Sequence, residues 1–232
     1  MKINFFIGYD PKEDIAYRVC KFSLLKRSSS NVNVLSLKLD ELISKKLYTR
    51  TIDPLASTQF TYTRFLVPKL MNYKGWAVFC DCDFIFLADV NDLIKSLDDS
   101  KAIYCVKHDY SPKEKHKMDG KIQSVYPRKN WSSFIIFNCS HPSTKKLTVD
   151  RVNNETGAYL HQFKWCKDEE IGSLDERWNW LEGWTSKSNK NKPFAVHYTR
   201  GGPWFNQWKG VEFAEDWILE RDEYLNKKFN IN

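Results

Sequence analysis

Two aspartates, Asp81 and Asp83, interrupt an apolar run over residues 75–87 and are the residues best suited to chemistry in this sequence. The strand-forming residues before them predict a strand buried on both faces of a sheet. In extended backbone the two carboxylates point to one side, while Cys82 points away. Converging carboxylates need a cation, and Mg²⁺ or Mn²⁺ shared with substrate phosphates fits this requirement. The alternative is that one aspartate caps a turn and the other pairs with a Lys or Arg.

His197 and Arg64 are two further candidates for such a site. His197 follows a short predicted strand over residues 193–196, a position that suits either a metal ligand or a hydrogen-bonded residue at a sheet edge. Arg64 lies in a predicted helix over residues 57–70, which Pro68 interrupts or ends. Its planar guanidinium suits phosphate or sugar oxygens, and the alternative is a solvated surface charge.

The rest of the pattern predicts a single α/β domain over residues 1–226 and a tail over 227–232. The chain opens with a strand, a glycine turn and a helix, and ligands bind beyond the carboxyl ends of such strands, so Gly8, Tyr9 and Asp10 lie at the expected binding edge. Predicted strands cover residues 3–8, 33–39, 76–80, 102–106, 133–139 and 193–196. Predicted helices cover residues 14–26, 57–70, 89–97, 145–152 and 157–164, and a last helix ends at 226.

Composition limits the classes of function. The 232 residues carry a net charge of +7, with the basic residues spread along the chain, which favours phosphorylated ligands and anionic membrane surfaces but gives no nucleic-acid signature. The six cysteines lack zinc-site spacing and suit buried, reduced thiols in a cytoplasmic protein. No apolar run reaches the ~20 residues of a membrane span. Residues 111–128 are Lys-rich with little periodicity, which predicts a functional loop or lid.

The order of these motifs, from the IGYD of the first strand to the HYTRGGPW after the last, resembles the glycosyltransferases of the GT-A fold. The resemblance is to the family-8 type, which includes glycogenin and bacterial lipopolysaccharide galactosyltransferases. It spans most of the chain. It implies a Rossmann-like mixed sheet flanked by helices, and a retaining transfer of sugar from a nucleotide-sugar donor, with a UDP-sugar as the expected donor.

The resemblance also implies roles for particular residues. Mn²⁺, or Mg²⁺, would be held by Asp81, Asp83 and His197. An Asp-Gln pair of the family corresponds to Asp168 and Glu169, which would be the catalytic pair. The donor-binding residues would be Gly8, Tyr9, Asp10, Arg64, Asp81, Cys82, Ser132, Arg200 and Gly201.

Three departures from the family pattern affect these roles. Glu169 replaces an amide and supplies a carboxylate that could act as a nucleophile or base, although the acidic cluster is also typical of the first turn of a helix. Trp131-Ser132-Ser133 replaces the Asn-Ala/Ser-Gly of the family. The family has a lysine in the motif that corresponds to HYTRGGPW, and this lysine is absent here. Arg200 is expected to supply the phosphate-facing charge in its place.

Three classes of function stay open at this stage. The first is a metal-dependent glycosyltransferase acting on a glycan, lipid-linked or protein acceptor, with or without peripheral membrane association. The second is a nucleotidyltransferase, which would prefer a glycine- and lysine-rich phosphate loop that the sequence IGYDPKED does not provide. The third is a non-catalytic carbohydrate-binding protein in which the nine tryptophans serve as sugar platforms.

Overall fold

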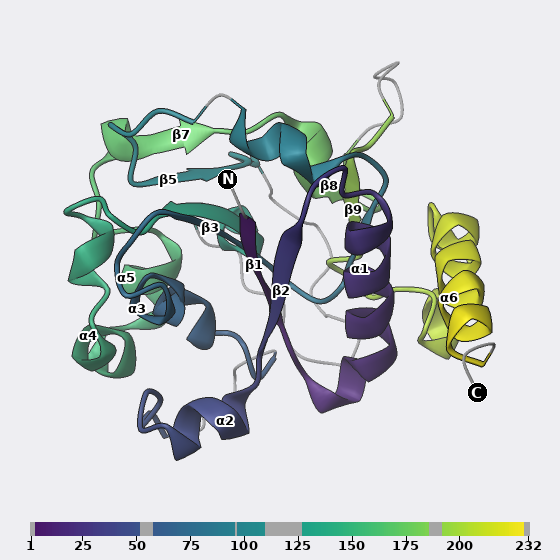
Figure 1. Ribbon diagram of the computed structural model, residues 1–232, viewed down its shortest axis with the longest axis horizontal. Coiled ribbons are helices and arrows are strands. Elements are labelled where there is room, and N and C mark those ends of the chain that lie inside the picture. The colour runs from purple at the N-terminus through teal and green to yellow at the C-terminus, as the bar shows by residue number, and fades with distance from the viewer. Residues whose placement is uncertain (1–2, 52–57, 96, 110–126, 186–191, 230–232) are drawn as a thin grey trace.

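A computed structural model describes residues 3–51, 58–95, 97–109, 127–185 and 192–229, and helices flank its mixed six-stranded sheet (Figure 1). The strand order is β2-β1-β3-β6-β5-β7, where β6 runs antiparallel to β3 and β5. The strands are β1 (Ile3–Gly8), β2 (Val32–Leu37), β3 (Trp76–Cys80), β5 (Ile103–Cys105), β6 (Phe134–Asn138) and β7 (Ile171–Ser173). The predicted α/β class is confirmed.

Strand register brings the ends of β1 and β3 together. The two strands are parallel, with Ile7 paired to Cys80, so that Gly8 and Asp81 follow at the same edge of the sheet. The predicted strands over 3–8 and 76–80 match β1 and β3. The carboxyl edge of the sheet is therefore where the first glycine turn meets the paired aspartates.

A second, three-stranded sheet was not predicted, and it carries the histidine. It consists of β4 (Phe84–Phe86), β9 (Ala195–His197) and β8 (Trp180–Leu181), in the order β4-β9-β8. Antiparallel pairing sets Phe84 of β4 opposite His197 of β9. Because β4 begins immediately after Asp83, this pairing brings His197 beside the aspartates across more than a hundred residues of sequence.

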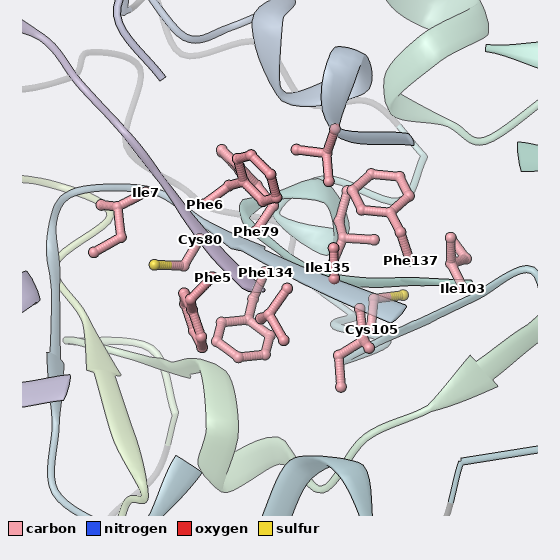
Figure 2. Close-up of a cluster of buried hydrophobic side chains, with 14 of the residues drawn as sticks. Phe5, Phe6, Ile7, Phe79, Cys80, Ile103, Cys105, Phe134, Ile135 and Phe137 are labelled. Atoms are coloured by element: carbon pink, nitrogen blue, oxygen red, sulfur yellow. The ribbon is translucent and has the colours of Figure 1, made fainter. Parts of the chain in front are cut away.

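Aromatic residues from both sheets form the core between the layers. Phe5 of β1 packs edge-on against Phe86 at 5.5 Å and against Phe134 at 6.2 Å between ring centroids. Figure 2 shows Phe5 and Phe134 on one face of the central strands, and Phe6, Phe79 and Phe137 on the other. Each fully buried side chain of this size contributes about 1.5–3 kcal/mol, so this cluster fixes the strands that end at the candidate site.

The helices cover the sheet in two groups (Figure 1). The α-helices are α1 (Asp14–Lys26), α2 (Leu39–Ser44), α3 (Val67–Leu70), α4 (Val149–Asn154), α5 (Gly157–His161) and α6 (Ala214–Phe229). Helix α1, predicted with these bounds, is joined to α6 by ion pairs of Arg27 and Lys26 with Glu220, at 2.6 and 3.2 Å. The N- and C-terminal parts of the chain thus lie side by side.

Several predicted helices differ from the structure. The segment predicted over 89–97 forms a 3-10 turn over Val90–Ile94, and the helices predicted over 145–152 and 157–164 are α4 (Val149–Asn154) and α5 (Gly157–His161).

Two further differences concern α6 and the helix predicted over 57–70. Helix α6 continues to Phe229, so the tail predicted from residue 227 begins later. The helix predicted over 57–70 is, in its described part, a series of turns, a 3-10 turn over Thr63–Leu66 and the short helix α3, in which Pro68 occupies the first turn. Proline is tolerated there because the first amides of a helix have no intrahelical acceptor, so Pro68 starts a helix and does not end one.

The six cysteines are all free thiols, and five of them are buried, as predicted. Cys82 is fully buried in the core, which confirms that its side chain points away from the aspartates. Within the described ranges, no helix has the combination of length and apolar character that a bilayer crossing requires. Residues 111–126 of the predicted lid lie outside the described residues.

Candidate functional site

Asp81, Asp83 and His197 form a compact group, called here the Asp-Asp-His cluster. One ligand atom from each residue lies within 4.8 Å of the others. His197 Nε2 is 3.3 Å from Asp83 Oδ2, and the side chains of His197 and Asp83 are 3% and 13% exposed. Two carboxylates and an imidazole at this spacing offer the oxygen and nitrogen donors that Mn²⁺ or Mg²⁺ accepts. The three residues predicted as metal ligands are therefore brought together.

Arg64 is buried against this cluster. Its Nη1 is 2.8 Å from Asp81 Oδ1, and the exposed fractions of the two side chains are 6% and 16%. Its nitrogens also donate to the backbone carbonyls of Ser132 at 2.7 Å and Phe60 at 3.3 Å. The guanidinium lies over the Phe79 ring at 4.9 Å. The alternative of a solvated surface charge is therefore wrong, and Arg64 lies beside the carboxylates as predicted.

The residues 130–133, called here the Trp131 turn, hold several parts of the site at once. Asn130 begins the turn in the left-handed region, with φ of 65°, a conformation that asparagine tolerates better than most residues. The carbonyl of Ser133 accepts from the Asp81 amide at 2.9 Å, and the carbonyl of Ser132 accepts from Arg64. The Trp131 indole donates to the His108 carbonyl at 2.8 Å. The turn that departs from the family pattern is thus the common support of Arg64 and Asp81.

The ring of His197 is fixed on three sides. It stacks on Phe84 with 4.4 Å between ring centroids and 13° between planes. Its Nδ1 lies 3.0 Å from Asn179 Oδ1, and its Nε2 faces Asp83. Asn179 is fully buried and was not predicted, although a polar residue between Trp178 and Trp180 is a signal that it needs a buried partner.

His108 is a second histidine near the cluster, at the end of β5. Its Nε2 is buried and has no hydrogen-bond partner among the residues that the structure describes. Burial and, secondarily, the electrostatic interaction with His197 lower the pKa of His108 to about 3, so the His108 ring is neutral at ordinary pH. No role was predicted for this residue.

Gly8, Tyr9 and Asp10 lie at the predicted edge, where each makes a structural contact. A Cβ on Gly8 would lie 2.4 Å from the Phe60 ring, so only glycine fits there. The Tyr9 hydroxyl donates to Asp14 at 3.1 Å. Asp10, which is 6% exposed, accepts from the amides of residues 12 and 59. Their roles toward a donor stay predictions.

Asp168 and Glu169 do not join the Asp-Asp-His cluster. They precede β7, whose residue Ile171 is level with Ile103 at the start of β5, so their backbone lies at the edge where the parallel strands begin. The Asp168 carboxylate is 2.5 Å from Arg128, and Glu169, with a side chain 73% exposed, lies 3.8 Å from Lys167. By this register the backbone of Asp168 and Glu169 lies about one strand length along the sheet from Asp81. A catalytic role for the pair stays a prediction.

Arg200 and Gly201 follow β9, and Arg200 lines a pocket of about 490 Å³. Arg200 Nη2 is 3.0 Å from the carboxylate of Glu182, which is 1% exposed, and the guanidinium lies 5.4 Å from the Trp208 ring. Gly201 has φ of 137°, a conformation that favours glycine. Arg200 therefore neutralises a buried acid, which the sequence did not reveal. Its phosphate-facing role stays a prediction.

Comparison with known proteins identifies the fold and a relative. No protein-family profile matches the chain. The chain is 53% identical over 228 residues to Protein CDI of Arabidopsis thaliana. The alignment covers 96% of this chain and 88% of Protein CDI.

Among solved structures, the apo WbbM bifunctional glycosyltransferase has a TM-score of 0.68 at 16% identity and covers 95% of this chain, which spans about half (49%) of the WbbM chain. The galactosyltransferase LgtC, in complex with donor and acceptor sugar analogues, has a TM-score of 0.62 at 10% identity and covers 96% of both chains. GlyE of Streptococcus pneumoniae TIGR4 has a TM-score of 0.62 at 14% identity and covers 99% of this chain and 63% of GlyE. This chain therefore has the GT-A glycosyltransferase fold and belongs to the same family as Protein CDI of Arabidopsis thaliana.

Proposed function

We propose that this protein is a metal-dependent glycosyltransferase that moves a sugar from a nucleotide-sugar donor, a UDP-sugar, to an acceptor hydroxyl. The observation that carries the proposal is the Asp-Asp-His cluster at the carboxyl edge of β3. Ligands bind at this edge of open α/β sheets. The GT-A fold shared with WbbM, LgtC and GlyE supports the same reading.

The residues present fit a divalent cation. Asp81 and Asp83 supply hard carboxylate oxygens, and His197 supplies an imidazole nitrogen within 4.8 Å of them. This mixture favours Mn²⁺ and also accommodates Mg²⁺, which prefers oxygen ligands. Asp81, Asp83 and His197 would hold the ion, and the chemistry it would supply is neutralisation of the negative charge that builds on the leaving diphosphate. The protein's own part is to hold the three ligands in one orientation.

The surroundings supply further positive charge and exclude water. Arg64 lies 2.8 Å from Asp81 with a side chain only 6% exposed, so its guanidinium acts in a low-dielectric setting. Such preorganised donors stabilise a charge that develops during reaction more strongly than solvated groups do. We propose retention of the anomeric configuration on the family resemblance, and the anomer of the product measures it directly.

Thermal unfolding with Mn²⁺ and UDP tests the binding half of the proposal. A ligand at 100 times its Kd stabilises the folded state by about 2.7 kcal/mol, so the pair should raise Tm by several degrees. UDP should add stability only when Mn²⁺ is present, and the stabilisation by the pair should disappear in Asp83→Ala. Indifference of the wild type to Mn²⁺ with any nucleoside diphosphate would refute the proposal.

Turnover is tested by screening a panel of nucleotide sugars for Mn²⁺-dependent hydrolysis and transfer. Release of nucleoside diphosphate from one member of the panel, abolished by Asp83→Ala, is the expected result. Binding without turnover of any donor, in the presence of candidate glycan, lipid-linked and protein acceptors, would favour the carbohydrate-binding alternative.

A further inference from the structure

Asn179 connects His197 to the Trp131 turn through buried hydrogen bonds. Asn179 has no solvent exposure. Its Oδ1 lies 3.0 Å from His197 Nδ1, and its Nδ2 lies 2.9 Å from Ser133 Oγ. A longer contact of 3.4 Å runs from the same Nδ2 to the Asn130 carbonyl. Ser133 Oγ in turn donates to that carbonyl at 2.7 Å.

The direction of these hydrogen bonds follows from the one group that can only accept. The Asn130 carbonyl has no proton, so Ser133 Oγ, at 2.7 Å, must donate to it. The Ser133 hydroxyl has then used its only proton and accepts from Asn179 Nδ2. With its amino group turned toward Ser133, Asn179 presents its oxygen to His197, and this oxygen can only accept. His197 Nδ1 therefore carries a proton.

The tautomer decides what the other ring nitrogen can do. A neutral imidazole has one N–H, so with the proton on Nδ1 the Nε2 atom carries a lone pair. That lone pair faces Asp83 Oδ2, another acceptor, at 3.3 Å. Two acceptors at this distance need a cation between them. The geometry therefore leaves Nε2 available as a metal ligand.

We propose that Asn179, oriented by Ser133, is a positioning residue that holds His197 in the Nδ1–H tautomer and directs Nε2 into the metal site. The use of that tautomer for metal binding rests on the function proposed above. Partners of this kind raise the basicity of a ligating histidine and fix its ring plane, and their loss costs about 10–100-fold in metal affinity.

The same turn ties this relay to the rest of the site. Ser133 orients Asn179 through its hydroxyl and holds the Asp81 backbone through its carbonyl at 2.9 Å. Ser132 holds Arg64 through its carbonyl at 2.7 Å. The orientation of His197 and the position of Asp81 are thus set by neighbouring residues of one turn.

The decisive experiment is ¹⁵N NMR of the histidine side chains in the metal-free protein, about two pH units above the ordinary histidine pKa of about 6.5. The protein has five histidines, and the spectrum of His197→Gln identifies the signals of His197. Wild type should show the Nδ1–H tautomer. Asn179→Asp keeps an oxygen acceptor and should keep that tautomer, whereas Asn179→Leu should shift His197 toward Nε2–H, which can donate to Asp83. An Nε2–H tautomer in wild type, or no change in Asn179→Leu, would overturn the proposal.

Calorimetric titration with Mn²⁺ alone provides the second readout. Asn179→Leu should weaken binding about 10–100-fold, and Asn179→Asp should bind more tightly than Asn179→Leu. Asn138→Leu is the matched control, because Asn138 is also a buried amide, 5% exposed, but it bonds to the carbonyls of Asp99 and Lys101 at the other end of β6. The control should lose stability but keep both the tautomer and the Mn²⁺ affinity. Equal losses of affinity in the two leucine variants would reduce Asn179 to a structural role.

Ser133→Ala keeps the test usable if Asn179→Leu does not fold. It leaves Asn179 in place but removes the hydroxyl that orients the amide, so a mixture of His197 tautomers is expected. A pure Nδ1–H signal in this variant would contradict the orienting role of Ser133. If wild type binds no Mn²⁺, the proposed function fails, while the NMR comparison still decides the tautomer.

Discussion

Two buried arginine–carboxylate pairs occupy neighbouring parts of this molecule and differ in how they are built. Arg200 places Nη2 within 3.1 Å of both oxygens of Glu182 and adds Nε at 3.3 Å. Arg64 Nη1 lies 2.8 Å from Asp81, and the guanidinium also donates hydrogen bonds to two backbone carbonyls. The first arginine is committed to its acid, whereas the second is held in place by the backbone and touches its acid from one side.

The surroundings of the two acids differ in the same direction. The Glu182 side chain is 1% exposed and also accepts from the Glu212 amide at 3.2 Å. The Asp81 side chain is 16% exposed and lies within 4.8 Å of ligand atoms of Asp83 and His197. A buried pair whose acid is surrounded by donors stabilises a loop, while a pair beside a second acid and an imidazole can exchange partners. The difference indicates which pair belongs to a binding site.

The largest expected effect comes from breaking the Arg200–Glu182 pair. Glu182→Ala leaves the guanidinium of Arg200 without its acid, and losing one member of a buried pair costs about 3 kcal/mol or more. Urea unfolding should show this loss, while the folded variant keeps its Mn²⁺ affinity. The double variant Glu182→Leu/Arg200→Met should recover most of the stability. Loss of Mn²⁺ binding in folded Glu182→Ala would show that the pair is part of the site.

Removing a residue of the Asp-Asp-His cluster should weaken Mn²⁺ binding more than it lowers the stability of the fold. Asp83→Ala removes one of the three ligands in the Asp-Asp-His cluster, and the expected loss of Mn²⁺ affinity is at least about 100-fold, or about 2.7 kcal/mol. Calorimetry with Mn²⁺ measures the loss. Asp92→Ala, at an exposed position in a 3-10 turn, is the control and should bind normally. A change of less than threefold in Asp83→Ala would remove this residue from the ligands.

The parts of the fold that could be predicted from sequence are those specified locally. The strand over Ile3–Gly8 and the helix over Asp14–Lys26 have the predicted bounds because their apolar period is carried within the segment. The three-residue strand Phe84–Phe86 was missed because its only distinguishing feature is its pairing with residues 195–197. Short strands of this kind are defined by a distant partner and leave no periodic signal.

The candidate site divides in the same way. The Asp-Asp-His cluster could be predicted because the resemblance to the GT-A family assigns its three residues to one site. The Arg200–Glu182 pair could not be predicted, because no sequence pattern indicates that these two residues are in contact. Asp168 and Glu169 were assigned by motif order alone, and the direction of β7 places them at the opposite edge of the sheet from Asp81.

A substitution of Arg64 tests the Arg64–Asp81 pair more finely. If its charge competes with a cation for Asp81, then Arg64→Met should tighten Mn²⁺ binding about tenfold, because a positive charge 2.8 Å from a ligand oxygen has been removed. Binding of UDP in the presence of Mn²⁺ should weaken at the same time, since a phosphate-facing donor is lost. Calorimetric titrations with Mn²⁺ alone and with both components separate the two effects. Weaker binding of Mn²⁺ alone would mean that Arg64 supports the cluster and does not compete with it.

The smallest effect concerns a carboxylate that is held without any arginine. Burial alone would raise the pKa of Asp89, but hydrogen bonds from Ser29 and Asn91 together lower it below the ordinary value. A lowered folded-state pKa means that Asp89 stabilises the protein above the ordinary aspartate pKa of about 3.9 and that this stabilisation is lost as the pH falls below it. Asp89→Asn should therefore cost about 1 kcal/mol at neutral pH and lose less stability than wild type on acidification, as urea unfolding at a series of pH values would show. Parallel curves for the two proteins would mean that the hydrogen bonds from Ser29 and Asn91 do not lower the pKa of Asp89 in the folded protein.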